Sequence, residues 1–323
     1  MSHDKVITVL GATGTQGGAV TRALLADFSV RAVTRDAASP KAQALAGIGA
    51  EVVTASLDDE GSLRRAFDGA YGAFLVTPYW EHRSPARELA EVENLIGAAQ
   101  TAGLRHVVWS TLEDTREVIT AGDDRMPVIG DGYRVPHFDV KGGAADALFA
   151  KSGLPTTYLL MSFYWENLLG LAKPQRDPDG TLAFHLPLGD APIAGVASDD
   201  IGRVVRRVLH RPAETIGATI PVVGESLTGE QMAAALSTAL GEPVAYRPPT
   251  PDQFRSFGFP GADELGNMFQ YYAEFPESYL GRRDLEVART FNPEPLSLAD
   301  FLAAHRDELA PDGQRPACRL TSL

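Results

Sequence analysis

The sequence predicts an α/β fold, in which a doubly wound parallel sheet is followed by a smaller α+β C-terminal region. Two observations support this prediction. Short runs rich in β-branched residues alternate with segments of helical periodicity through the first half of the chain, and a glycine-rich turn separates the first run from the first helix. The 323 residues suffice for one large α/β domain with additions or for two modest domains.

Six short apolar runs are expected to be strands, because near-continuous apolar character indicates burial on both faces of a sheet. They cover residues 6–10, 30–33, 52–54, 73–76, 106–109 and 157–160. Most of the segments between them carry apolar residues at i, i+3 and i+4 spacing, which indicates helices that cross over the sheet. We expect these helices at residues 19–25, 42–48, 63–67, 89–99 and 144–149.

The second half of the chain departs from this alternation. Residues 113–136 are polar and glycine-rich without a clear period, and loops of this length are usually lids or disordered. After Pro174 the pattern is mixed, with expected elements at residues 198–209 (helix), 220–223 (strand), 230–240 (helix) and 297–309 (helix).

These patterns suggest a division of the chain into three parts. We expect a dinucleotide-binding domain over residues 1–160, a smaller C-terminal α+β region over 161–312 and a frayed tail over 313–323. The first boundary is not strict, since strands of the later region are allowed to join the main sheet.

Charge and composition exclude several classes of function. The formal net charge of −13 disfavours direct contact with nucleic acid or an anionic membrane, which usually requires a basic face. The single cysteine, Cys318, cannot form an intrachain disulfide, and no apolar stretch is long enough for a signal or a membrane span. We therefore expect a cytoplasmic protein. The seven histidines are scattered singly, so no metal site is predicted, and the oligomeric state is left open.

The glycine-rich turn is the strongest functional signal. It follows the first strand, opens the first helix and places Gly11, Gly14 and Gly17 at three-residue intervals. In the Rossmann type of domain such glycines permit a tight turn, a close approach to pyrophosphate and close packing of helix on strand. A turn that serves packing alone is the alternative. The residues expected to contact the cofactor here are Gly11, Thr13, Gly14, Thr15, Gln16 and Gly17.

The end of the second strand favours NADP(H) over NAD(H). An acidic residue at this place would bind the ribose of NAD, but the chain has Arg35, whose guanidinium is suited to a 2′-phosphate, and Lys41 follows. A solvated surface arginine, or Asp36 as a ribose acceptor, is the alternative. Asp58, beside Asp59 after the third strand, is a candidate for the adenine edge or for a cap of the next helix.

Several motifs together resemble the NmrA-like family of atypical short-chain dehydrogenases/reductases. They are residues 9–18, 33–35, 74–80, 137–142 and 166–169, and residues 258–262 and 265–269 are similar to redox-sensing members of the family. The resemblance implies an NADP(H)-binding Rossmann domain with a C-terminal region over the cleft. Family members include NADPH-sensing regulators, co-regulators that act through protein partners, and reductases. The long 113–136 segment and the extended tail depart from the pattern.

Short-chain dehydrogenases usually place a tyrosine four residues before a lysine, and here His137 precedes Lys141. Lys141 is expected to hold the ribose of the cofactor, and His137 is a candidate proton donor or simply a capping or packing histidine. Ser110 ends the fifth strand, where a hydroxyl near the substrate or a turn former is expected. Thr77 and Tyr79 follow the fourth strand and are expected at the cofactor, although Tyr79 is nearly as well explained by core packing.

These residues lead to two hypotheses of function. The first, which is favoured because the usual tyrosine is missing, is an NADP(H) sensor or regulator in which residues 113–136 act as a switch that a protein partner recognises. The second is an NADPH-dependent reductase of a small apolar quinone, enone, imine or carbonyl compound. In that case Lys141, alone or with His137, handles the proton.

Overall fold

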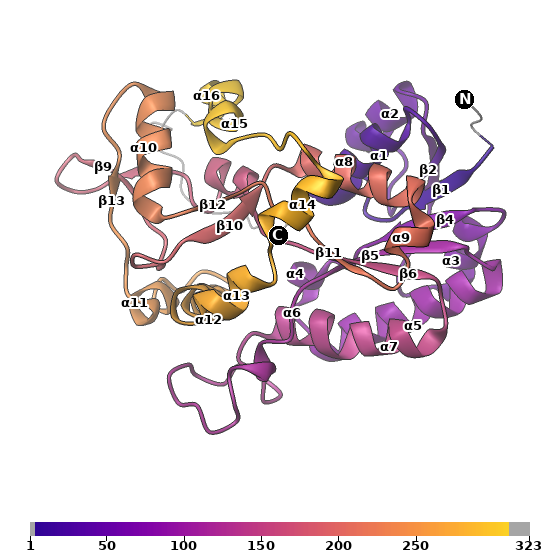
Figure 1. Cartoon of the computed structure of the whole chain (residues 1–323), viewed down its shortest axis with the longest axis horizontal. Helices are drawn as coiled ribbons and strands as arrows, with labels where there is room; N and C mark the ends of the chain where they lie inside the picture. The colour runs from indigo at the N-terminus through magenta and orange to yellow at the C-terminus, as the bar shows by residue number, and fades with distance from the viewer. Residues whose placement is uncertain (1–3, 310–323) are drawn as a thin grey trace.

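The computed structural model describes residues 4–309, and its centre is a seven-stranded parallel sheet (Figure 1). The strand order is β11-β6-β5-β4-β1-β2-β3, so the chain winds outward in both directions from the junction of β1 and β4. This order confirms the predicted doubly wound α/β fold. The strands are β1 (Val6–Val9), β2 (Ser29–Thr34), β3 (Glu51–Thr54), β4 (Gly72–Leu75), β5 (His106–Thr111), β6 (Thr156–Leu160) and β11 (Thr219–Pro221).

Helices cover both faces of this sheet. One apolar core, which includes Val20 and Val204, lies under α1 (Thr15–Leu24), α2 (Pro40–Gly47) and α8 (Ser198–His210). The other core, which includes Leu95 and Phe149, lies under α3 (Glu60–Phe67), α5 (Pro85–Ala102) and α7 (Asp146–Ser152). Ligands of such sheets bind outside the carboxyl ends of the strands, at the point where the winding reverses. The carboxyl ends of β1 and β4 are therefore the expected position of a site.

Short elements lie at the carboxyl edge of the main sheet. They are α4 (Tyr79–His82), the 3₁₀ helix η1 (Thr115–Glu117), α6 (Pro136–Phe138) and the π-helix η2 (Asp139–Ala145). A π-helical segment is uncommon and is frequently found at functional sites. This edge thus carries irregular structure where the sequence predicted functional residues.

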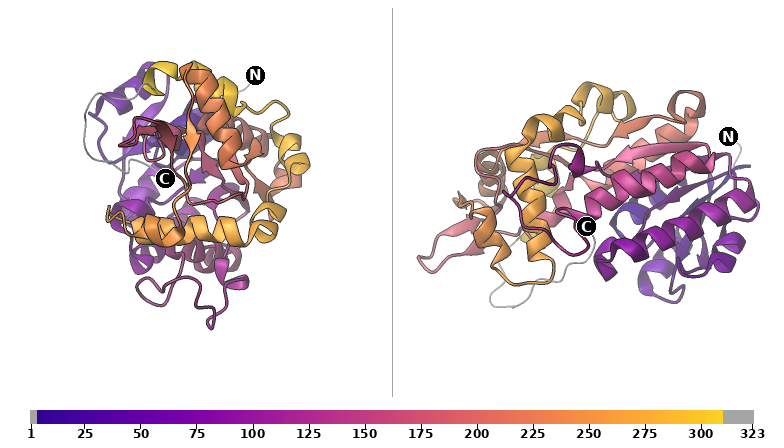
Figure 2. Two further views of the ribbon diagram at one scale, coloured as in Figure 1. Left: turned by 90° about the vertical axis from the view of Figure 1, so that its left-hand side faces the viewer. Right: turned by 90° about the horizontal axis from the view of Figure 1, so that it is seen from below.

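A second body of structure packs against that edge, seen at the left of Figure 1 and again in Figure 2. It has its own apolar core, which contains Trp165, Phe269 and Tyr271. Two three-stranded sheets belong to it, with orders β12-β10-β7 and β13-β9-β8. Their strands are β7 (Phe163–Tyr164), β8 (Gln175–Arg176), β9 (Leu182–Phe184), β10 (Ile193–Val196), β12 (Glu225–Leu227) and β13 (Ala245–Tyr246). The remaining helices of the second half are η3 (Trp165–Leu169), α9 (Pro212–Thr215), α10 (Gly229–Leu240), α11 (Pro251–Arg255), α12 (Ala262–Glu274), α13 (Pro276–Gly281), α14 (Leu285–Phe291), α15 (Leu298–Ala304) and α16 (Arg306–Leu309).

The second half of the chain also contributes to the main sheet. The strand expected at 220–223 is β11, which pairs in parallel with β6, and α8 packs on α1. The main sheet therefore uses residues beyond the 1–160 range. The prediction of a single helix over residues 297–309 is wrong. The chain leaves helical geometry at His305, so this segment forms two helices, α15 and α16. The expected tail, residues 313–323, lies outside the described residues.

The long segment 113–136 is more firmly held than a disordered loop or a free lid would be. Ile119, Met126 and Val135 are buried in the core of the second body. The side-chain amide of Asn267 on α12 donates hydrogen bonds to the carbonyls of Pro127 and Arg134, at 2.9 and 2.7 Å. The sequence did not reveal these anchors, because the apolar residues of the segment are spaced without a period.

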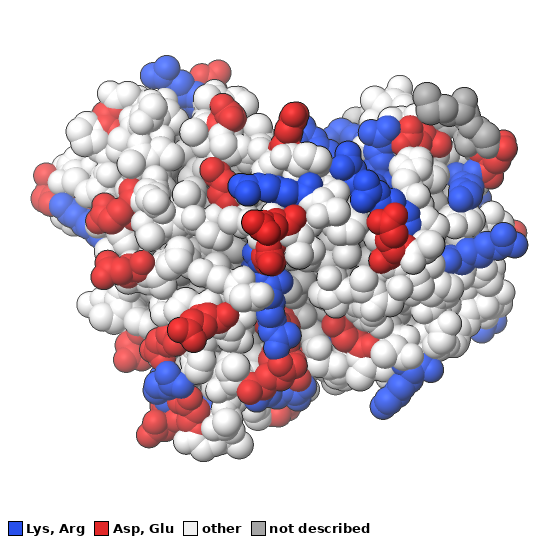
Figure 3. Space-filling model, viewed as in Figure 1, with Lys and Arg blue, Asp and Glu red and all other residues white. Residues whose placement is uncertain are grey.

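The charged surface is mixed, with one basic concentration in the view of Figure 3. Lys and Arg side chains gather there around α8, and acidic side chains lie between and around them. A cleft of about 790 Å³ in this region is lined by Arg203, Arg206, Arg207, His210 and Arg211, among others. Several of these cations have acidic neighbours, since Asp27 pairs with both Arg206 and His210. Among the described residues, no helix has the length and apolar character needed to cross a bilayer.

The contact between α1 and α8 leads to a first prediction. A Cβ atom at Gly202 would lie 2.5 Å from the carbonyl oxygen of Ala19. Gly202→Ala is therefore expected to lower the free energy of unfolding by about 1–3 kcal/mol, as overpacking usually does. Urea unfolding is the measurement. Gly47→Ala in α2, where a Cβ atom would meet nothing within 4 Å, is the control and is expected to be neutral or slightly stabilising. If both variants were equally stable, the close contact between Gly202 of α8 and the Ala19 carbonyl of α1 would be contradicted.

Candidate cofactor and active site

The glycine-rich turn has the geometry of a pyrophosphate cradle. Gly11 has a φ of +60°, which favours glycine, and a Cβ atom at Gly17 would lie 2.3 Å from the carbonyl oxygen of Gly11. Gly14 is the N-cap of α1 and no side chain caps that helix end. An uncapped helix N-terminus next to side-chain-free backbone suits a phosphate group, so these residues fit a dinucleotide.

The other predicted residues of this turn lie around the start of α1. Thr13 is half-buried before the helix, and Thr15 and Gln16 form its first turn. The Gln16 side chain donates a hydrogen bond to the Tyr164 hydroxyl at 2.8 Å, which ties the first turn of α1 to β7. The turn is thereby connected to the second half of the chain.

Arg35 lies directly after β2, and its guanidinium makes two hydrogen bonds to the carboxylate of Glu81, one of them 2.8 Å long. Lys41 is exposed on α2. The Asp36 carboxylate accepts the backbone N–H of Ala38 at 2.9 Å and so closes a local turn. The structure thus places Arg35 at the expected edge but already paired with an acidic side chain.

Asp58 and Asp59 have different roles in the structure. Asp59 is the N-cap of α3 and accepts the backbone N–H of Ser62 at 3.1 Å. Asp58 instead pairs with Arg87 of α5 at 2.8 Å. The capping alternative therefore holds for Asp59, and the adenine role of Asp58 stays a prediction.

Lys141 lies in the π-helix η2 with its ammonium group buried. Its Nζ contacts the hydroxyl of Thr77 and the carboxylate of Glu88, and it lies 3.3 Å from the Thr77 carbonyl oxygen. Nζ also lies 5.4 Å from the centre of the Trp109 ring. Glu88 is fully buried on α5, so the positive charge of Lys141 is compensated by a carboxylate that is shielded from water.

His137 is held by a buried carboxylate from the second body. One oxygen of Glu264 on α12 accepts both the backbone N–H of His137, at 2.9 Å, and its ring Nδ1–H, at 2.6 Å. The Tyr79 hydroxyl donates to the other oxygen at 3.3 Å. Burial, followed by the charge of Glu264, raises the pKa of Tyr79, which therefore remains a neutral donor. Within the described chain, Nε2 of His137 makes no hydrogen bond, so this nitrogen is the one available for chemistry.

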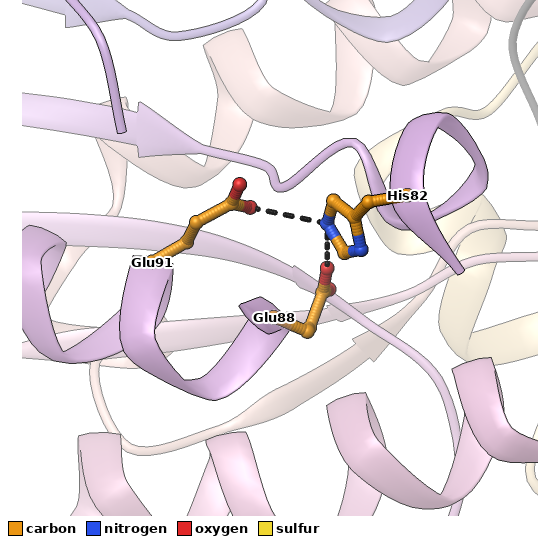
Figure 4. Close-up of side chains that lie close together, drawn as sticks. All are labelled: His82, Glu88 and Glu91. Atoms are coloured by element: carbon orange, nitrogen blue, oxygen red, sulfur yellow. Dashed lines mark ion pairs between the residues drawn. The ribbon is translucent and has the colours of Figure 1, made fainter. Parts of the chain in front are cut away.

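A second buried cluster lies beside Lys141 and is shown in Figure 4. Nε2 of His82 lies between the carboxylates of Glu88 and Glu91, at 3.6 and 3.5 Å. These three side chains are spaced closely enough to be considered as metal ligands. However, the backbone N–H of Ser84 donates to Nδ1 of His82 at 3.0 Å, so the neutral ring carries its proton on Nε2. A metal would need a lone pair there and usually a donating Nδ1–H, which argues against a metal at this cluster.

The carboxylates of this cluster are not equivalent. Burial, followed by the negative charge of Glu88, raises the pKa of Glu91 to about 7. Burial lowers the pKa of His82. The Nε2–H of His82 therefore faces one carboxylate that is paired with Lys141 and another whose pKa is raised to about 7.

Ser110 is not brought into contact with these groups. Its neighbours Trp109 and Thr111 both donate to the Asp146 carboxylate at 2.8 Å, on the face of the sheet covered by α7. Burial raises the pKa of Asp146 to about 7. Since side chains alternate along a strand, Ser110 points toward the opposite face. Its catalytic role remains a prediction.

The sequence prediction missed the acidic side chains of the site. Glu88 and Glu91 lie at helical spacing with Val92 and Leu95, so both carboxylates fall on the apolar face of α5. Two acidic residues on the apolar face of a predicted helix could have indicated a buried polar site, because carboxylates are rarely buried without a partner. For Glu264 no local signal existed, because its partner His137 is 127 residues away in the chain.

Comparison with known proteins agrees with this architecture. The model of the NmrA-like family matches residues 3–302. An NAD(P)H azoreductase from Xenophilus azovorans is 31% identical over 307 residues, covering 93% of this chain and 98% of the relative. FrzB, an NmrA-like family domain-containing oxidoreductase from Cladobotryum sp, is 29% identical over 340 residues, with coverage of 93% and 98%.

A solved structure shows the same fold. NmrA, a negative transcriptional regulator, superposes in its NAD complex with a TM-score of 0.77 at 23% identity, covering 94% of this chain and 95% of that one. The same regulator has also been solved in complex with NADP, with a TM-score of 0.74. The family match over nearly the whole chain confirms the resemblance noted in the motifs, and the chain belongs to the NmrA-like family.

Proposed function

We propose that this protein is an NADPH-dependent reductase of a small apolar acceptor, in which His137 supplies the proton. The observation that carries the proposal is the buried Glu264–His137 pair, whose histidine lies four residues before the buried Lys141 in the chain. The sensor hypothesis was favoured only because the usual tyrosine is absent. A histidine oriented by a carboxylate is a group that can replace the tyrosine as proton donor.

The glycine-rich turn and Arg35 support the choice of cofactor. The turn fits a pyrophosphate, and the planar guanidinium of Arg35 suits the 2′-phosphate that distinguishes NADP(H) from NAD(H). NmrA has been solved with each of the two cofactors. The preference for NADP(H) in this chain therefore rests on Arg35, with Lys41 as a second positive charge nearby.

Reduction requires a hydride and a proton at the acceptor. The bound cofactor supplies the hydride from its nicotinamide. Glu264 fixes the orientation of the His137 ring through Nδ1–H, so that a doubly protonated ring presents its Nε2 proton to the atom that gains negative charge. Lys141, positioned by Thr77 and Glu88, holds a positive charge at the same edge and is suited to bind ribose hydroxyls. The acceptor thus gains a hydride and one proton, which together are two electrons and two protons, and the His137 ring is left neutral.

The surroundings of His137 favour a flat, apolar acceptor. Its ring centre lies 4.7 Å from that of Trp80, 4.8 Å from that of Phe138 and 5.8 Å from that of Tyr79. Aromatic side chains of this kind pack well against conjugated rings. Azo, quinone and imine compounds share this character, and one relative at 31% identity is named an azoreductase.

The sensor hypothesis remains as a second candidate for one structural reason. Helix α12 carries Glu264, which binds His137, and also Asn267, which anchors the 113–136 segment. A change at His137 on cofactor binding can therefore reach that segment through a single helix. A partner that recognises residues 113–136 would then respond to the cofactor.

A second prediction tests the cofactor assignment. Arg35→Ala is expected to weaken NADPH binding by about ten-fold or more, because a charge-assisted bidentate contact is lost, and to leave NADH binding nearly unchanged. Equilibrium titration with each cofactor is the measurement. Arg22→Ala, which also removes an exposed, ion-paired arginine, is the matched control. An equal loss for both cofactors would remove the 2′-phosphate assignment.

A third prediction separates the reductase from the sensor. The purified protein is expected to oxidise NADPH steadily with an azo or quinone acceptor. His137→Gln is expected to lower kcat by about 100-fold at unchanged NADPH affinity, since general acid catalysis typically contributes this much. Lys141→Ala is expected to lower both kcat and NADPH affinity. Absence of turnover across azo, quinone, imine and carbonyl compounds, with NADPH binding intact, would favour the sensor.

A further inference from the structure

Each of the four residues of α4 contacts a residue of the candidate site. This short helix follows β4 and ends at Arg83, the only non-glycine residue with a positive φ (49°) in the described part of the chain. Left-handed geometry is strained for such a residue, which indicates that its surroundings hold it there. The contacts are Tyr79 with Glu264, Trp80 with His137, Glu81 with Arg35, and His82 with Glu88 and Glu91.

The pair between Glu81 and Arg35 links α4 to the cofactor. Arg35 donates from both terminal nitrogens to the two oxygens of Glu81, so the guanidinium edge that would bind an anion is already occupied. The side chains are exposed by 71% for Arg35 and 49% for Glu81. The pair is therefore open to a competing anion from solvent, and a 2′-phosphate that binds Arg35 in the same way must displace the carboxylate.

We propose that Glu81 is an internal competitor for the 2′-phosphate of NADP(H) and thereby a determinant of cofactor selectivity. Its carboxylate holds Arg35 when no 2′-phosphate is bound, is displaced by the phosphorylated cofactor and stays in place when NAD(H) binds. The inference rests on the cofactor assignment of the proposed function, but it does not depend on turnover.

The size of the competition follows from the exposure of the pair. Exposed ion pairs contribute little, so the carboxylate is expected to weaken binding of a 2′-phosphate by about five-fold and not by orders of magnitude. The displaced carboxylate remains tethered to α4 and still repels the phosphate, which adds to the effect at low salt. The preference for NADP(H) over NAD(H) then depends on how much more strongly Arg35 binds the 2′-phosphate than it binds the carboxylate of Glu81.

Displacement of Glu81 also has a consequence for the active site. Trp80 and His82 are its direct neighbours in a helix of four residues, and Trp80 lies against His137. Because α4 has only four residues, a shift of its backbone on release of Glu81 is expected to change the surroundings of Trp80. Occupation of Arg35 by a 2′-phosphate is therefore expected to be detectable at Trp80.

Two nucleotides without nicotinamide test the competition directly. Adenosine 2′,5′-bisphosphate carries the 2′-phosphate, and AMP lacks it. Glu81→Gln is expected to tighten binding of the bisphosphate by about five-fold in calorimetric titrations and to leave AMP unchanged. Glu60→Gln, which removes the partner of Arg64 in another exposed pair, is the matched control and is expected to alter neither. Unchanged bisphosphate affinity in Glu81→Gln, or equal tightening of both nucleotides, would overturn the proposal.

Tryptophan emission provides the second measurement. The bisphosphate is expected to change the emission of the wild-type protein, whereas AMP is not, and Trp80→Phe is expected to remove the change. In Glu81→Gln the change is expected to be reduced, because no carboxylate has to be displaced. Bisphosphate selectivity without any Trp80-dependent change would overturn the role of α4. Lack of any 2′-phosphate selectivity in the wild type would overturn the cofactor assignment as well.

Discussion

The architecture depends on the requirement that buried charges be paired. Arg283 and Glu113 have side chains exposed by only 0% and 1%, and they form a two-pronged ion pair. Arg283 also donates to the carbonyl oxygen of Met161. Loss of one partner of such a pair leaves an uncompensated charge and typically costs several kcal/mol. This pair therefore fixes the second body of the protein on the carboxyl edge of the main sheet.

The same requirement builds the site between the two parts of the chain. Glu264 from α12 satisfies the backbone and ring N–H groups of His137, and Glu88 from α5 compensates the charge of Lys141. Neither His137 nor Lys141 finds its carboxylate partner on its own helix. The carboxylates that surround these two side chains come from other elements, so the proposed site forms only when these elements pack together.

These dependencies explain how far the sequence could predict the structure. The strands, the crossover helices and the glycine-rich turn follow local patterns, and their existence was predicted correctly, with ends shifted by a few residues. The pairing of β11 with β6 and the anchoring of residues 113–136 depend on contacts between residues far apart in the chain. No local hydrophobic periodicity indicates such contacts. His137 and Lys141 were predicted as candidates from their spacing, but Glu264 was missed because a buried carboxylate on a distant helix leaves no mark near its partner.

The excess of acidic residues is reflected in the ion pairs of exposed cations. Arg35 was expected to bind a 2′-phosphate, and the structure shows that Glu81 already pairs with it. The same happens on α8, where Asp27 pairs with Arg206 and His210. In a chain with a net charge of −13, carboxylates are abundant enough to occupy exposed cations. At Arg35, an anionic ligand would then compete with the internal acid Glu81. The affinity for this ligand would depend on the difference between the Arg35–ligand and Arg35–Glu81 interactions. Selectivity for a 2′-phosphate would then depend on Glu81 as well as on Arg35.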